Sequence, residues 1–333
     1  MEFLREYAFF FLETFTVVFA ILFVAAGLVS ILMKGQKEKG KLIEINNISE
    51  KYESYKNLLQ KNTLSKKALK GFLKSEKQRF KLQKKELKTQ GKNRLFLLRF
   101  NGDIRASAVE SLREEITAVL SVADQSDEVL LSLESSGGMV HAYGLAASQL
   151  LRLKSQKIPL TVAVDKIAAS GGYLMACVGD KIIAAPFAII GSIGVLAQIP
   201  NFNRLLKENK IDFEQITAGE HKRTLSLFGE NTEKGRVKLQ EEIEETHQLF
   251  KNFILKQRNI TDLEKIATGE HWYGSRAKEL NLIDDLMTSD DYLLEKSKER
   301  NLFEITYKTK RGLFKKLGYS AKSKANEIFG YMK

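Results

Sequence analysis

The 333-residue sequence has one cysteine and four histidines. Because Cys177 has no second cysteine to pair with, an internal disulfide is excluded. There is no Cys-x-x-Cys motif and no Cys/His cluster of the kind that binds zinc, so we expect no zinc site. Cysteine usage leaves the redox compartment open. We expect Cys177 itself to be a small buried hydrophobic residue rather than a nucleophile.

Proline is absent from residues 35–92, and positive charge is concentrated there. Residues 34–94 contain 19 Lys and Arg but six Asp and Glu, whereas the whole chain has a net charge of +12. The rest of the chain is therefore close to neutral, and we expect no nucleic-acid partner. Residues 35–92 are rich in Lys, Glu, Gln and Leu, which predicts a solvated, basic helical stalk. The alternative is a basic surface attracted to anionic lipid headgroups.

Residues 14–33 form an uncharged run between Glu13 and Lys34. A helix of this length is about 30 Å long, which matches the hydrocarbon core of a bilayer. The run is longer than the apolar part of a signal peptide, and no clear cleavage site follows it. The sequence therefore predicts an uncleaved anchor within residues 1–34 that contacts membrane lipid. Lysines after the run place the following residues in the cytoplasm by the positive-inside rule.

From residue 93 onward, strand-like and helix-like segments alternate. Strands are predicted at 94–100, 128–134, 159–165 and 180–186, and helices at 107–124, 139–154 and 233–258, with shorter helices over 262–300. This alternation predicts an α/β domain with a parallel sheet and crossover connections. We expect residues 93–300 to form the catalytic domain and residues 301–333 to form a basic tail.

Two glycine-containing loops, Ser135–Gly138 and Ala168–Gly172, each follow a predicted strand and precede a predicted helix. Glycines let a backbone turn tightly, and free N–H groups at a helix start favour negative charge. Such donors are what an oxyanion site needs during acyl transfer, and Ser170 would present its hydroxyl beside them. Taken alone, both segments could also be ordinary turns.

A nucleophilic serine needs a base, and the residues alone leave its identity open. A histidine could serve, and the candidates are His141, His221, His247 and His271. The competitor is Lys222, which can act as a base only if burial lowers its pKa. Apolar residues near it in the sequence could provide that burial, namely Ile216, Leu225, Leu227 and Phe228.

Four segments occur in an order that resembles the inner-membrane proteases of the signal peptide peptidase A family: LESSGGMVHAYGLAASQL, AASGGYLMAC, IGSIGVLAQIPNFNRLL and TAGEHKRTL. The resemblance extends from Leu95 to about Asp285 and also includes the anchor and the stalk. It implies a crotonase-like (ClpP-like) ββα spiral for the catalytic domain. It also implies a serine endopeptidase that uses a Ser/Lys dyad.

Carried over by position, the resemblance makes Ser170 the nucleophile and Lys222 the general base. Gly138 matches an oxyanion donor, and the N–H of Gly171 is the expected second donor. Ser192 matches a hydroxyl that orients the lysine amine. The family's first loop commonly reads Ser-Pro-Gly-Gly, whereas Ser136 stands at the proline position here, so the loop should be less fixed in φ.

The implied activity is cleavage of peptides, signal peptides or membrane-protein fragments through an acyl-enzyme, without metal or cofactor. The resemblance also implies a homo-oligomer at a bacterial inner membrane, with the catalytic domain on the periplasmic side. The lysines that follow the anchor indicate the cytoplasmic side instead.

Two alternatives to the protease function stay open. One is a crotonase-fold acyl-CoA hydratase or isomerase, which would use carboxylates such as Glu134 or Asp165. The other is a non-catalytic membrane scaffold.

Overall fold

The computed structural model describes residues 10–12, 14–19, 22, 42–65, 67–74, 78 and 93–308. No helix among these residues is both long and apolar enough to cross a membrane. Most of the predicted anchor at 14–33 lies outside the described residues, as do much of the predicted stalk and all of the tail from residue 309. Ile43–Thr309 form one compact unit.

The unit is built on a mixed sheet in the order β1-β10-β2-β3-β4-β6-β9. The strands are β1 (Ile43–Asn47), β2 (Arg94–Gly102), β3 (Glu128–Ser135), β4 (Leu160–Val164), β6 (Lys181–Ala184), β9 (Asp285–Leu286) and β10 (Asn301–Tyr307). All neighbours in this row pair in parallel except β1, which runs antiparallel to β10. Parallel strands need crossover helices, which explains the alternation in the sequence.

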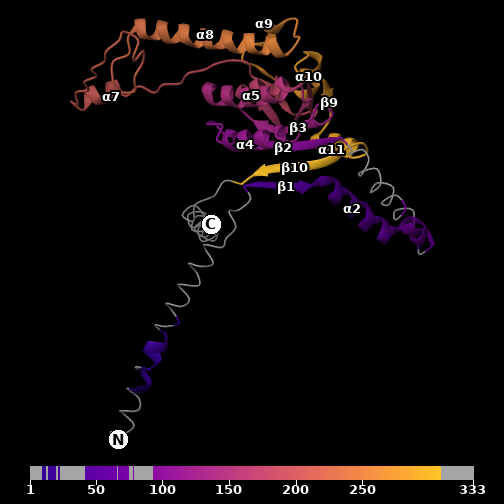
Figure 1. Ribbon diagram of the computed structural model, residues 1–333. Coiled ribbons are helices and arrows are strands. Elements are labelled where there is room, and N and C mark those ends of the chain that lie inside the picture. The colour runs from indigo at the N-terminus through magenta and orange to yellow at the C-terminus, as the bar shows by residue number, and fades with distance from the viewer. Residues whose placement is uncertain are drawn as a thin grey trace, which may run out of the picture. The chain divides into compact units, whose positions relative to one another are not determined.

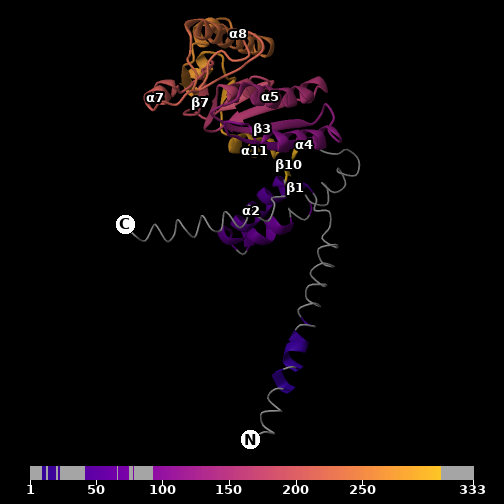
Figure 2. The same ribbon diagram turned by 90° about the vertical axis from the view of Figure 1, so that its left-hand side faces the viewer.

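Helices cover both faces of this sheet, so its central strands are apolar on both sides. Phe96, Leu98 and Phe100 of β2 join the core formed with α4 (Val109–Leu120) and α5 (Val140–Ser155). Leu95 and Leu97 point to the opposite face and pack with residues of α11 (Ser289–Lys296). In both views α8 (Glu233–Gln257) forms a further layer beyond α5 (Figures 1 and 2).

A short second row of strands branches from the end of β3. Its members are β5 (Ile167–Ala169), β7 (Ile189–Gly191) and β8 (His271–Tyr273). Ser135 at the end of β3 pairs with Ala168 of β5, whereas earlier residues of β3 pair with β4. This branch places the ends of β3, β5 and β7 beside one another. The glycine loops and the residues after β7 therefore meet at one edge.

An arm leaves the sheet after β7 and returns through α8. It contains α7 (Asn203–Glu208) and a segment, 209–232, that forms no regular helix or strand. Figure 1 shows α7 and the start of α8 extending beyond the edge of the sheet. Exposed aromatic rings cluster there, with ring centres 6.0 Å apart for Phe202 and Phe228 and 5.8 Å apart for Phe213 and Phe228.

The strands and long helices predicted between residues 93 and 258 are confirmed, with ends that shift by a few residues. Two predictions are corrected. Residues 262–300 contain the strands β8 and β9 between α9 (Leu263–Ile266), α10 (Gly274–Glu279) and α11, and are not only helical. The sheet also extends past both predicted domain boundaries, because β1 lies in the predicted stalk and β10 begins at residue 301. The rest of the described stalk is helical, mainly in α2 (Ile48–Thr63).

Candidate active site

Ser170 lies at the tight turn between β5 and α6 (Gly171–Ala176), with φ of 50° and ψ of −120°. A positive φ is costly for a residue with a side chain, and such strain persists only where the surroundings fix it. Here the Ser170 N–H donates to the carbonyl of Gly191 at 2.8 Å, and its carbonyl accepts from the Leu174 N–H at 3.0 Å. This strand-to-helix turn presents a half-buried hydroxyl, as in the nucleophile elbow of other hydrolases.

The first glycine loop packs directly against this turn. A side chain at Gly137 would begin 2.8 Å from the Cβ of Ser170 and 2.7 Å from the nitrogen of Gly171, and Gly137 has a φ of +89°. At Gly138 it would begin 2.1 Å from the carbonyl oxygen of Ile104. Both positions therefore need glycine, because a side chain at Gly137 would clash with the Ser170 turn and one at Gly138 would clash with the backbone of Ile104.

The N–H groups of Gly138 and Gly171 have no acceptor among the described residues. Gly138 is exposed, and Gly171 is the first residue of α6, where an N–H has no partner within the helix. The free N–H of Gly171 directly follows Ser170, and that of Gly138 directly follows Gly137, the residue that packs against the Ser170 turn. Such a pair can bind an oxygen that becomes negatively charged.

Ser192 is the third element of the site, and it sits beside Ser170 across paired strands. Ala169 of β5 pairs with Gly191 of β7, so the next residue of each strand is a serine. Ser192 also has a φ of 50°, and its N–H donates to the carbonyl of Glu270 at 2.6 Å. Two serines with strained backbone thus follow neighbouring strands. The predicted nucleophile and the residue predicted to orient the lysine therefore follow paired strands at the same edge of the sheet.

Lys222 is not brought to them within one chain. It lies in the arm, is exposed, and lines a hollow of about 590 Å³ that does not include Ser170. No hydrogen bond or ion pair between described residues joins Lys222 to Ser170. The expected burial of Lys222 against its neighbours is also wrong for the single chain, since Ile216 is 94% exposed and Leu227 and Phe228 are exposed as well. The arm has too little core of its own to bury a lysine.

The four histidines do not supply an alternative contact. His141, His221 and His271 are exposed, and His221 lies 3.9 Å from the carboxylate of Glu220. His271 belongs to β8 and pairs with Gly191. His247 is half-buried in α8, and its Nε2 has no hydrogen-bond partner among the described residues. None of the four is hydrogen-bonded to Ser170 in the part of the chain that is described.

Other groups near the site are engaged in structural contacts. Glu134 forms an ion pair with Lys166 at 3.0 Å, and Asp165 accepts hydrogen bonds from the backbone N–H and hydroxyl of Ser289. Burial raises the pKa of the Cys177 thiol to about 12, which confirms Cys177 as a buried hydrophobic residue and removes it as a nucleophile. Neither carboxylate is placed as a free general acid or base.

The loop after β2 also belongs to the site, and the sequence interpretation did not include it. The Met139 N–H donates to the carbonyl of Ile104 at 2.8 Å, and the Tyr143 hydroxyl donates to the carbonyl of Asp103 at 2.7 Å. A signal was present in the sequence, because Asn-Gly-Asp at 101–103 is typical of a turn, although in the structure β2 continues to Gly102 before the chain turns.

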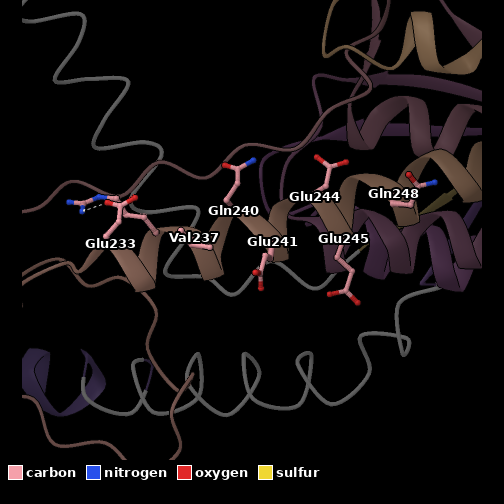
Figure 3. Close-up of a pocket in the computed structure, with 8 residues that line it drawn as sticks. Glu233, Val237, Gln240, Glu241, Glu244, Glu245 and Gln248 are labelled. Atoms are coloured by element: carbon pink, nitrogen blue, oxygen red, sulfur yellow. Dashed lines mark hydrogen bonds and ion pairs between the residues drawn. The ribbon is translucent and has the colours of Figure 1, made fainter.

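A larger hollow of about 790 Å³ lies along the outer face of α8. Its side chains all come from this helix, and Figure 3 shows those of Gln240, Glu241, Glu244 and Glu245 spreading outward instead of converging on one point. It contains no candidate nucleophile. This face of α8 therefore offers no group for nucleophilic chemistry.

Comparison with known proteins agrees with a crotonase-like α/β fold. A family model described as peptidase family S49 N-terminal matches residues 2–150, and one described as peptidase family S49 matches residues 152–302. A probable protease SohB of Haemophilus influenzae is 50% identical over 98% of this chain and 95% of its own length. A putative protease SohB of Buchnera aphidicola is 42% identical over 100% of this chain and 99% of its own length.

More distant relatives match part of the chain. A putative protease of Methanocaldococcus jannaschii is 32% identical over 57% of this chain and 63% of its own length. The chain therefore belongs to peptidase family S49, and the predicted resemblance to the signal peptide peptidase A family is confirmed. SohB-type proteases are similar to it over nearly its whole length.

Proposed function

We propose that the chain is a serine endopeptidase in which Ser170 is the nucleophile and Lys222 is the general base. The observation that carries the proposal is the strained backbone of Ser170, packed against the first glycine loop, with no acceptor among the described residues for the N–H groups of Gly138 and Gly171. Backbone strain of this kind is retained at functional sites because it presets a reactive group. A serine hydroxyl beside two unpaired donors suits attack on a carbonyl.

In the proposed reaction, neutral Lys222 takes the proton of Ser170 as its oxygen attacks the peptide carbonyl. The N–H groups of Gly138 and Gly171 hold the resulting oxyanion, and Ser192 orients the lysine amine. The protonated lysine then gives its proton to the leaving amine, and water hydrolyses the acyl-enzyme by the same proton transfers in reverse order. The acyl-CoA alternative is disfavoured, because Glu134 and Asp165 are already paired with other groups.

Lys222 must reach Ser170 from a second copy of the chain in this proposal. The arm exposes the apolar residues Phe213, Ile216 and Phe228 around Lys222. The loop after β2 exposes Ile104, at 70%, and Met139, which directly follows the first glycine loop, is exposed as well. Packing the arm of one copy on the loop of the next would cover both apolar surfaces. It would also remove water from Lys222, which lowers the pKa of a lysine and makes it a base.

Residues 14–33 are proposed to anchor the protein in a bacterial inner membrane, as the apolar run indicates. The lysine-rich flank favours a cytoplasmic catalytic domain, whereas the family resemblance favours a periplasmic one. A reporter fused after residue 40 distinguishes the two locations. Alkaline phosphatase is active only outside the cytoplasm, and green fluorescent protein exported in unfolded form is not fluorescent.

Signal peptides and membrane-protein fragments are the proposed substrates, since the active site would stay close to the bilayer.

Covalent labelling with a peptidyl phosphonate tests the proposal. We expect one label per chain, located on Ser170 by peptide mapping, and none in Ser170→Ala. Ser170→Ala and Lys222→Ala should each abolish peptide hydrolysis. The double variant should have the same residual rate as either single variant, because the two side chains act as a unit. Retained hydrolysis in Lys222→Ala together with an inactive His221→Ala would move the role of base to histidine. A folded wild-type protein that is never labelled would support the scaffold alternative.

A further inference from the structure

Tyr143 touches both glycine loops, although nothing in the proposed reaction uses it. It lies on the first turns of α5 and is fully buried. Its hydroxyl lies 2.5 Å from the Ser135 Oγ in the first loop. Its ring lies under the second loop, where a side chain at Gly171 would begin 2.5 Å from the Tyr143 Cγ. One rigid side chain therefore contacts the chain segments that carry both oxyanion donors.

The hydrogen bonds of this hydroxyl have one defined direction. The Tyr143 hydroxyl donates its only proton to the carbonyl of Asp103 at 2.7 Å. In the contact with Ser135, Tyr143 must therefore accept, and Ser135 must donate. The Ser135 Oγ in turn accepts the N–H of Gly137 at 3.1 Å. The result is a buried chain that runs from Gly137 through Ser135 and Tyr143 to the loop after β2.

This chain of hydrogen bonds engages one N–H of the first loop and leaves the next one without an acceptor among the described residues. The N–H of Gly137 is held inward by Ser135, whereas the next N–H, that of Gly138, has no acceptor among the described residues. Consecutive hydrogen bonds of one direction polarise one another, which strengthens the chain as a whole. The loop carries Ser136 where the family commonly has proline. A side-chain hydrogen-bond chain can supply the rigidity that a proline ring would otherwise give.

We propose that Tyr143 is a positioning residue that fixes the distance between the two oxyanion donors, through the Ser135 hydroxyl on one side and contact with Gly171 on the other. The proposal rests on the proposed function, because it assigns a role within that same site. It predicts that loss of the hydroxyl affects the transition state more than substrate binding, since the oxyanion exists only after attack.

The test is Tyr143→Phe, which removes one hydroxyl and keeps the ring. Active sites are first counted by complete phosphonate labelling. Rates are then divided by the concentration of labelled sites, so that unfolded protein does not affect the comparison. We expect kcat per labelled site to fall by about 10- to 100-fold with KM changed less than about twofold, because a small displacement of aligned groups costs this much. A peptide boronic acid, whose adduct places an oxygen in the oxyanion site, should lose affinity by a similar factor.

Two further variants separate positioning from general stability. Ser135→Ala should cause the same loss in kcat, and the double variant should be no worse than either single variant, because both break one chain. Tyr292→Phe is the matched control, since that buried hydroxyl contacts Thr161 at 3.0 Å in the cluster on the opposite face of the sheet. It should lower the melting temperature and leave kcat per site unchanged.

The outcomes separate this inference from the function on which it rests. If the wild-type protein is not labelled at Ser170, the proposed function fails and the role of Tyr143 fails with it. If the wild type is labelled and active, two results overturn the role of Tyr143 alone. One is a Tyr143→Phe variant with wild-type kcat and boronate affinity. The other is a loss confined to KM or shared equally by Tyr292→Phe.

Discussion

At Gly138 the backbone has no room for a side chain, because a Cβ would lie 2.1 Å from the carbonyl oxygen of Ile104. We predict that Gly138→Ala forces the loop outward and displaces its free N–H. Removal of one oxyanion donor lowers kcat by about 10²- to 10³-fold in other hydrolases, and we expect a loss of that size here, measured as peptide hydrolysis per folded protein.

Gly144→Ala is the control for this substitution. Gly144 lies in the interior of α5, and a Cβ there would have no atom within 4 Å apart from its chain neighbours and the nearby backbone of its own helix. Alanine in place of glycine inside a helix stabilises by about 0.5–1 kcal/mol, so this variant should unfold at a higher urea concentration and keep full activity. If Gly138→Ala also keeps full activity, the N–H of Gly138 is not an oxyanion donor.

The sequence predicts some residues of the site and misses others for a physical reason. Ser170, Gly138 and Gly171 could be proposed because four segments in order resemble one protease family, whereas each glycine loop taken alone could also be an ordinary turn. Tyr143 could not, because an aromatic residue at helical spacing is most simply explained as part of a core. Its ring is indeed buried. Only the contacts of its hydroxyl distinguish it from the other aromatic side chains of the core.

Among the elements, α4 holds the end of the last strand through a buried carboxyl group. Glu115 is 4% exposed, and its Oε1 accepts the N–H of Tyr307 at 2.8 Å. Its Oε2 has no partner among the described residues. Burial raises the pKa of Glu115 above its ordinary value of 4.5. The folded state therefore favours the protonated form of this group.

This pKa shift predicts how stability depends on pH. Because the folded protein binds the proton more tightly than the unfolded chain, the contribution of Glu115 to stability falls as pH rises through 4.5 and above. Glu115→Gln cannot ionise, so its free energy of unfolding relative to wild type should increase between pH 4 and pH 7, measured by urea unfolding. Glu114→Gln removes an exposed charge from the same helix and serves as the control. If the difference in free energy of unfolding between Glu115→Gln and wild type is the same at pH 4 and pH 7, the raised pKa of Glu115 is contradicted.

The sequence pattern also explains why some elements were predicted and others were not. Strands β2, β3 and β4 are buried on both faces and read as continuous apolar runs between turns. In β10 only Leu302 and Ile305 are buried, so the alternation of apolar and polar residues that predicts a strand is weak there. β8 has three residues, of which two are exposed. Pairing with neighbours, which the local sequence does not encode, makes these segments strands.

For the whole molecule, the separation of Lys222 from Ser170 within one chain is the central observation. Burial of a lysine beside a serine is a property of three-dimensional contacts and cannot be read from apolar neighbours in the sequence. The residues that were expected to cover Lys222 are themselves largely exposed. A head-to-tail contact between copies would repeat around a ring, because each copy offers both an arm and a loop.

Subunit mixing tests this arrangement. Ser170→Ala and Lys222→Ala chains are each expected to be inactive alone. When they assemble together in equal amounts, roughly a quarter of the contacts join an intact Ser170 to an intact Lys222 of the neighbouring copy. We therefore predict recovery of about a quarter of the wild-type hydrolysis rate and of the phosphonate labelling. A mixture of Ser170→Ala with the double variant should stay inactive, since no intact Ser170 is present. If the first mixture is also inactive although both chains co-assemble, each active site is formed within one chain, and the arm must instead fold back onto its own sheet.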